Sequence, residues 1–208
     1  MDLNLKAKTF KDGLYALEAM VYQTEMAVIG DTHTTTLITD NVNFFTKSFL
    51  ISACAHLEMC IKELVFEISK DIDARLSSAA IPSSIVEWRL KKKSETSTAP
   101  KNLLSVNMTK KEIDDLVSGN VYRTKEAFAL VGIDLAVQKI KWESWKDSIQ
   151  AIVTRRNNIV HHNNDASDLS LGDINIYIKS IIDYIDFIIQ SCHQQYFMGM
   201  TNINLKID

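Results

Sequence analysis

Apolar residues recur along most of this chain at the three- and four-residue spacing of an amphipathic α-helix. They predict a first helix over residues 5–28, which the Gly30-Asp31 pair and the Thr-rich run behind it bring to an end. A second pattern predicts a helix from Asp40 to Arg75, with Asp40 as its N-cap. At the rise of a regular helix, that element would be about 50 Å long. The first third of the chain is therefore expected to form two long helices.

The middle of the chain is less regular. Residues 76–108 contain Ser and Pro punctuation and predict a polar insertion, with a short helix around residues 85–90. Thr109-x-x-Glu112 has the form of a capping box and should start another helix. Residues 121–132 are a further candidate helix.

Two strong helical patterns close the chain. Ser144 can cap a helix that runs to about His162. Residues 174–189 are apolar on most of the helix surface, so this helix is expected to be buried in the core or against a second chain. With six Gly, two Pro and no strand-like alternation, the sequence predicts an all-α fold. We expect one domain over residues 1–208, an antiparallel up-and-down helical bundle with a polar insertion that forms a dimer.

Composition and charge restrict the class of protein only weakly. Hydrophobic residues make up 46% and charged residues 24%, which is ordinary for a soluble globular protein. The net charge of −3 gives no global basic field. Residues 85–111, however, carry seven Lys or Arg against two Glu. This segment, with Lys91, Lys92 and Lys93 at its centre, could follow a phosphate backbone or could be a solvated loop.

The cysteines and the apolar stretches bear on the compartment. Cys54, Cys60 and Cys192 form no CxxC pair and fall within apolar helical patterns, which favours buried thiols over disulfides or a zinc site. The chain shows no signal-peptide pattern at its start and no uncharged stretch long enough for a membrane span. We therefore expect a cytoplasmic protein without a metal, a cofactor or a membrane contact.

Two charged residues interrupt the apolar seams of their helices. Arg156 lies four residues after Ile152 and three before Ile159, so the seam runs through it. Glu58 interrupts the seam of the long early helix in the same way. Because an unpaired buried charge is very costly, we predict a Glu58–Arg156 ion pair that holds the guanidinium in place. A purely structural ion pair is the alternative to a functional one.

The polar end of the same helix carries the candidate chemistry. Asn157 and His161 are four residues apart and share a helix face, while Arg156 and His161 differ by a rotation of about 140°. A histidine can act as general acid or base, and an arginine can hold a phosphate oxygen. The adjacent His161 and His162 point about 100° apart and cannot readily share one metal ion. Taken alone, His161 could equally be a structural histidine at a helix end.

The Arg-Asn-x-x-x-His pattern at residues 156–161, followed by a polar loop and one more apolar helix, resembles the motif of the HEPN superfamily. Residues 55–58, Ala-His-Leu-Glu, preceded by Phe-Phe at 44–45, resemble the early helix of its RiboL-PSP subgroup. The resemblance covers about residues 40–195. It implies a ribonuclease fold in which the motifs of two subunits meet in a shared cleft.

The resemblance also implies a mechanism without a metal. In that family, the RNA's own 2′-hydroxyl attacks the adjacent phosphate and leaves a 2′,3′-cyclic phosphate. Carried onto this sequence, the catalytic residues are Arg156, His161 and Asn157, with Glu58 in a supporting role. Some HEPN toxins carry His-x-Tyr, whose tyrosine is modified by an antitoxin; here the equivalent residue is Asn163, which puts that control in doubt.

Two roles remain open for the neighbouring polar side chains and for the whole protein. Arg155 and His162 are either solvated neighbours or further RNA contacts, and Arg155 gives a second Arg-to-His spacing that the family permits. The expected partners are RNA, a second copy of the chain and an antitoxin or regulator from a neighbouring gene. The first hypothesis is a metal-independent endoribonuclease that acts as a toxin or phage-defence effector. The alternative is a catalytically silent HEPN module that binds RNA, a nucleotide or a protein.

Overall fold

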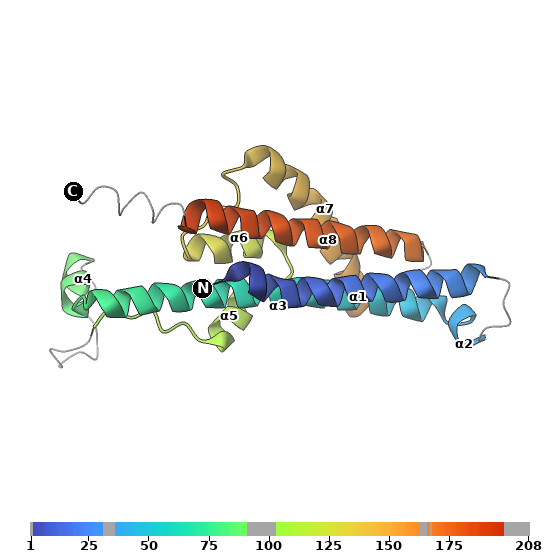
Figure 1. The fold of residues 1–208 in the computed structure, drawn as a ribbon, viewed down its shortest axis with the longest axis horizontal. Helices are drawn as coiled ribbons and strands as arrows, with labels where there is room; N and C mark the ends of the chain where they lie inside the picture. Colours follow the sequence, from blue (N-terminus) through green and yellow to red (C-terminus); the bar gives the residue numbers. More distant parts are fainter. Residues whose placement is uncertain (1, 31–35, 91–102, 163–165, 167, 198–208) are drawn as a thin grey trace.

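Three long helices carry the fold in a computed structural model of the protein (Figure 1). They are α1 (Leu3–Ile29), α3 (Val42–Ala79) and α8 (Leu171–Cys192). α1 runs antiparallel to α3 and α8, which run in the same direction as each other (Figure 1). The residues that the structure describes are 2–30, 36–90, 103–162, 166 and 168–197. Within these ranges no β-strand forms, and the predicted all-α bundle is confirmed.

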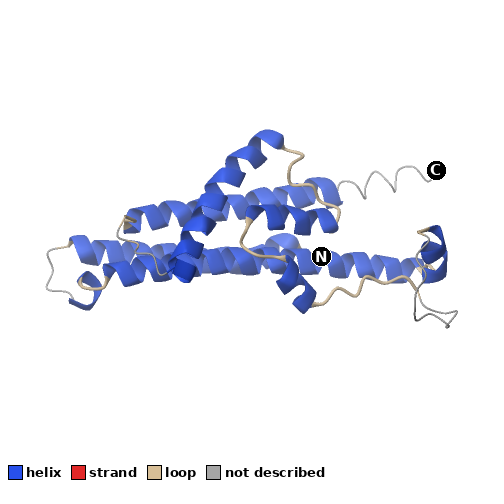
Figure 2. Cartoon of the chain, turned by 180° about the vertical axis from the view of Figure 1, so that it is seen from behind, coloured by secondary structure: helices blue, strands red, loops and turns tan. Residues whose placement is uncertain are grey.

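The other elements lie at the ends and on one side of these three helices. Seen from behind, α7 is steeply inclined to the long axis, α6 runs roughly along it, and α4 lies at the far end of α3 (Figure 2). Their bounds are α2 (Thr36–Thr39), α4 (Ser83–Arg89), α5 (Lys110–Leu116), α6 (Val121–Leu130), α7 (Lys139–His162) and a π-helical turn, η1 (His193–Phe197).

α8 is the centre of the core. Its apolar side chains contact α1, α3 and α7 of the same chain, and seven of them have no solvent exposure: Ile174, Ile178, Ile181, Tyr184, Ile185, Ile188 and Cys192. Burying each such side chain is worth about 1.5–3 kcal/mol. Of the two expected environments for this helix, the core of its own chain is therefore the observed one. Its apolar surface does not by itself call for a second chain.

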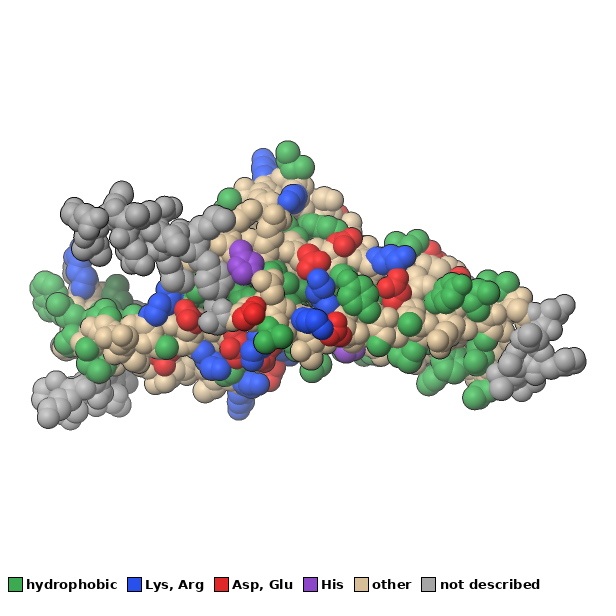
Figure 3. All heavy atoms as spheres, in the orientation of Figure 1, with side chains coloured by type: hydrophobic (Ala, Val, Ile, Leu, Met, Phe, Trp, Pro, Cys, Tyr) green, Lys and Arg blue, Asp and Glu red, His purple; other side chains and the backbone are tan. Residues whose placement is uncertain are grey.

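The face formed by α1 and α8 is electrostatically mixed. Figure 3 shows acidic and basic side chains interspersed on this face. Two ion pairs join the helices: Lys11 to Asp186 at 2.6 Å and Lys179 to Glu18 at 3.5 Å. Because charges of opposite sign lie next to each other here, this face offers no extended field of one sign to a polyanion.

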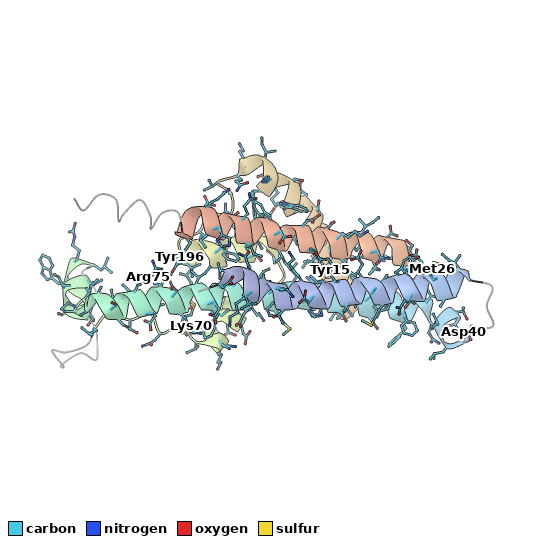
Figure 4. The ribbon with its side chains drawn as sticks, in the orientation of Figure 1. Tyr15, Met26, Asp40, Lys70, Arg75 and Tyr196 are labelled. Atoms are coloured by element: carbon cyan, nitrogen blue, oxygen red, sulfur yellow. The ribbon has the colours of Figure 1, made fainter. Side chains whose placement is uncertain are left out.

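The start of α3 differs from the prediction by a small but definite shift. α3 begins at Val42, and its N-cap is Asn41 instead of Asp40. Asp40 is exposed in the turn that leads into the helix (Figure 4). Apolar periodicity indicates a helical segment well but leaves the first residue uncertain by one or two positions.

The start of α7 was predicted wrongly. α7 begins at Lys139, and Ser144 lies inside it, where its carbonyl accepts a hydrogen bond from Ser148. The reason is tertiary packing: Trp142 is only 4% exposed, and its backbone N–H donates to the backbone carbonyl of Gln138 at 2.9 Å. Burial of this indole outweighs the local capping preference of a serine.

Two capping boxes define helix starts. The predicted Thr109–Glu112 box is confirmed at the start of α5, with both of its hydrogen bonds present. A second box, Ser170–Asp173, starts α8: the Asp173 N–H donates to Ser170 Oγ at 3.0 Å, and the Ser170 N–H donates to Asp173 Oδ2 at 2.8 Å. Both boxes satisfy backbone donors that a helix start otherwise leaves open.

The η1 turn, directly after α8, contacts α3 through Tyr196. The Tyr196 hydroxyl donates to Asp71 at 2.7 Å, and the Arg75 guanidinium lies 4.7 Å from the centre of the Tyr196 ring. Arg75 and Tyr196 are labelled where the two elements meet (Figure 4). This contact ties the segment after α8 to the long early helix.

We predict that Ser170→Ala lowers the free energy of unfolding by about 1 kcal/mol, because it removes the N-cap of the central helix. Urea denaturation measures the change. Ser180→Ala on the same helix is the control, since that hydroxyl bonds only to the carbonyl of Ile176 and should matter little. Equal effects of the two substitutions would contradict the assigned role of the cap.

We also predict a pH-dependent effect of Asp173→Asn. Hydrogen bonds from the Ser170 side chain and backbone hold the pKa of Asp173 below its ordinary value of 3.8. Because this pKa is lower in the folded state, the stabilisation is present above pH 3.8 and is lost as the pH falls through the folded-state pKa. Urea midpoints should therefore separate the variant from wild type at pH 7 and converge as the pH falls below 3.8. A difference that grows on acidification would refute this assignment.

Candidate functional site

The expected motif lies on the last turns of α7. The seam of this helix is buried at Ile149, Ile152 and Ile159, which are at most 5% exposed. Arg156 falls on this seam and is partly buried, as its position in the pattern predicts. The packing of α7 against the bundle therefore places a guanidinium at the edge of the core.

Arg156 has one hydrogen bond to its own helix and unused donor capacity. Its Nη1 donates to Asn157 Oδ1 at 2.9 Å. Its Nε is buried and finds no hydrogen-bond acceptor among the described residues. The guanidinium acts on the Cys54 thiol of α3: burial raises the pKa of this thiol to about 12, while the positive charge of Arg156 lowers it. Arg156 is thus close enough to α3 for its charge to act on Cys54, and its set of hydrogen-bond acceptors among the described residues is incomplete.

The predicted Glu58–Arg156 ion pair is wrong. Glu58 pairs with Lys62 at 2.8 Å, one turn further along α3, and Lys62 also binds Asp114 of α5 at 3.1 Å. Lysine four residues after glutamate is a favoured helical pair that needs no long-range positioning. The seam argument located both charges correctly, since the Glu58 side chain is only 23% exposed. It did not determine which cation the carboxylate binds.

Glu58 nevertheless lies close to α7. A Cβ atom added at Gly119 would lie 3.9 Å from Glu58 Oε2 and 3.6 Å from the Val153 side chain. Val153 precedes Arg156 by three residues on α7. The Glu58 carboxylate is therefore next to α7, about one turn before the guanidinium. Gly119, in the segment between α5 and α6, lies beside both residues, and an added Cβ atom would be in ordinary van der Waals contact with them.

His161 and Asn157 lie beyond this buried region. His161 is exposed on the last turn of α7, and no described residue forms a hydrogen bond with its imidazole. Asn157, four residues earlier, is partly buried and holds Arg156. One chain thus offers an exposed imidazole and a half-buried guanidinium on faces of one helix that lie about 140° apart.

The other expected contacts are only partly within the described residues. Arg155 is bound to Asp168 in the segment before α8, so it is not the solvated neighbour that was one expectation. The side chain of His162 lies outside the described residues, as do Lys91, Lys92 and Lys93. The described residues gather no group of three or more His, Cys, Asp or Glu side chains that could hold a metal ion.

The comparisons with known proteins agree with the motif and the fold. A model of the RiboL-PSP-HEPN domain family matches residues 24–194, which is most of the chain. The chain belongs to the RiboL-PSP-HEPN family. The match begins within α1, earlier than the expected residue 40. No curated protein and no solved structure gives a significant match. Across the part of the chain that the structure describes, no helix is long and apolar enough to cross a membrane.

We predict that the three thiols, including the one beside Arg156, are unreactive in the folded protein. Burial raises the pKa of Cys54, Cys60 and Cys192 from 9.0 to about 12 each. At pH 8 the thiolate fraction should therefore be about a thousandfold lower than in the unfolded chain. Mass spectrometry after iodoacetamide treatment should find no label in native protein and three labels in urea. Rapid native labelling of Cys54 would show that the region around Arg156 opens to solvent.

Proposed function

We propose that this protein is a metal-independent endoribonuclease of the HEPN type. The observation that carries the proposal is Arg156, a guanidinium on the core seam with unused donor capacity, close to the exposed His161 on the same helix. Membership in the RiboL-PSP-HEPN family supports a HEPN module in general. The reaction, its residues and its biological role are our proposal.

The chemistry needs a proton carrier and a cation near one phosphate. The 2′-hydroxyl of RNA attacks the adjacent phosphorus, the bond to the 5′-oxygen breaks, and a 2′,3′-cyclic phosphate and a 5′-hydroxyl result. His161 takes the proton from the 2′-oxygen or gives one to the leaving oxygen. Arg156 stabilises the charge that grows on the phosphorane. Asn157, bound to Arg156, orients the guanidinium.

Arg156 is the better candidate than Arg155 for the phosphate. The charge of Arg155 is already compensated by Asp168, whereas Arg156 forms no ion pair within the described residues. A cation that is held in position without a counter-charge keeps its attraction for an anion. Arg155 then serves to fasten the end of α7 to the segment before α8.

The reaction uses both an acid and a base, and one chain presents only one exposed imidazole in its described motif residues. We propose a symmetric homodimer in which both copies of Arg156 and His161 face one cleft. The exposed Val160, next to His161, supports a contact surface at this end of α7. Light scattering should give the mass of a dimer at micromolar concentration. A strict monomer with and without RNA would contradict this arrangement.

A catalytically silent module is the second candidate. One observation favours it: in a single chain Arg156 is partly buried and acts on Cys54, while His161 is exposed, so the two side chains differ in their access to solvent. Such a module would bind RNA, a nucleotide or a protein through the same surface. For the endoribonuclease, we propose a role as a toxin or phage-defence effector, with a regulator encoded by a neighbouring gene.

We predict that purified protein cleaves labelled RNA in EDTA and leaves cyclic-phosphate ends. Arg156→Ala and His161→Ala should each reduce the rate at least about a hundredfold, because one removes charge stabilisation and the other a proton carrier. Arg123→Ala, at an exposed arginine of α6, is the matched control and should retain the rate. Gel electrophoresis and end-group analysis measure both properties.

Two other outcomes would discriminate between the candidates. Cleavage that requires a metal and leaves 5′-phosphate ends would refute the mechanism. Intact RNA after long incubation, combined with RNA binding that depends on Arg156, would favour the silent module. Thermal melts of both variants separate a catalytic loss from a folding defect, since truncation at the exposed His161 should cost little packing.

A further inference from the structure

We propose that Lys62 is a positioning residue that keeps Glu58 away from Arg156 and so leaves the guanidinium charge available for an RNA phosphate. The inference rests on the proposed function, because it assigns a role to a residue that supports Arg156. Lys62 itself does not touch the substrate in this proposal. It acts through the carboxylate that it binds.

The Lys62 ammonium is held by two acids from two elements. Its Nζ lies 2.8 Å from Glu58 Oε1 on α3 and 3.1 Å from Asp114 Oδ1 on α5. Burial alone would lower the pKa of Lys62, but the hydrogen bonds with Glu58 and Asp114 outweigh it and raise the pKa above 10.5. The lysine therefore stays charged and holds Glu58 throughout the physiological pH range.

The carboxylate has a second cation near it. Glu58 and Arg156 both act electrostatically on the Cys54 thiol, in opposite directions. A Cβ atom added at Gly119 would lie 3.9 Å from Glu58 Oε2 and 3.6 Å from Val153, which precedes Arg156 by three residues on α7. The region between α3 and α7 thus contains an acid bound to Lys62 and a guanidinium that has no ion-pair partner among the described residues.

Loss of Lys62 would leave a partly buried carboxylate without its counter-charge. Such a group is strongly destabilising, and it relaxes toward any cation within reach. Arg156 acts on the same Cys54 thiol as Glu58, so we expect the released carboxylate to turn toward this guanidinium. The new ion pair would neutralise the guanidinium and weaken its hold on a phosphate. The ion pair that we expected from the sequence is, in this reading, the one that Lys62 prevents.

A neighbouring acid provides a matched control. Glu63 follows Lys62 directly but binds Lys6 at 3.4 Å and Lys110 at 3.6 Å. Its neutralisation changes the net charge by the same amount as neutralisation of Glu58. Of these two acids, only Glu58 acts electrostatically on the Cys54 thiol, as Arg156 does. The pair of substitutions separates a specific effect on Arg156 from a general effect of charge on RNA binding.

The first experiment measures binding of a fluorescent single-stranded RNA whose 2′-O-methyl groups prevent cleavage. Lys62→Met should weaken binding about as much as Arg156→Ala, on the order of tenfold. Lys62→Arg should bind like wild type, because it keeps the ion pair. Adding Glu58→Gln to Lys62→Met should restore binding, whereas adding Glu63→Gln should not. In an Arg156→Ala background, Lys62→Met should have no further effect.

Two results of this experiment would overturn the inference. Equal rescue by Glu58→Gln and Glu63→Gln would show a general charge effect. A further loss on Lys62→Met in the Arg156→Ala background would show that Lys62 binds RNA itself. Lys62→Leu, which also removes the ammonium and offers Glu58 no hydrogen-bond donor, serves as the second substitution if Lys62→Met does not fold.

The second experiment tests the exchange of partners without RNA. A double-mutant cycle of Glu58→Gln and Arg156→Ala in urea unfolding should show little coupling in wild type and about tenfold coupling in the unfolding constant in the Lys62→Met protein. Absence of that coupling overturns the inference whatever the RNA data show. If the wild-type protein neither binds nor cleaves RNA, the proposed function fails, and this cycle alone decides whether Lys62 controls the pairing.

Discussion

The rest of the structure depends on burying α8. This helix is apolar around most of its surface, and a helix of that kind is stable in water only when other elements cover several of its sides. α1 and α3 cover one side and α7 covers another. Because α7 must turn its own apolar seam inward to do so, Arg156 is drawn to the edge of the core. The position of the candidate site is thus a consequence of how the central helix is covered.

The charged side chains between α3 and α7 show what determines the partner that a partly buried ion binds. Glu58 has a lysine one turn away on its own helix, and α5 brings Asp114 to the other side of that lysine. A local helical pair forms without the entropic cost of bringing distant segments together. It is therefore favoured over a long-range pair of equal charge. As a result, Arg156 is bound to the side-chain amide of Asn157 instead of a carboxylate. Because this amide is neutral, the positive charge of the guanidinium stays available to attract a phosphate.

Gly119 and Asp168 each lie next to a residue of the candidate site. Gly119 lies between Glu58 and Val153, where any larger side chain would meet both. Asp168 compensates Arg155 and thereby distinguishes two adjacent arginines that the motif alone leaves equivalent. Neither residue belongs to the motif. Each acts by shaping or charging the surroundings of a residue that does.

The sequence by itself determined the helical class, the seam positions of Arg156 and Glu58, the buried thiols and the Thr109 capping box. These features depend on periodicity and on residues at most four positions apart, so they can be read along the chain. Only the tertiary structure decided the partner of Glu58, the compensation of Arg155 and the start of α7 at Lys139. Periodicity tells which face of a helix is buried. The side chains that meet on that face come from distant segments, and their packing and charges determine which contacts form.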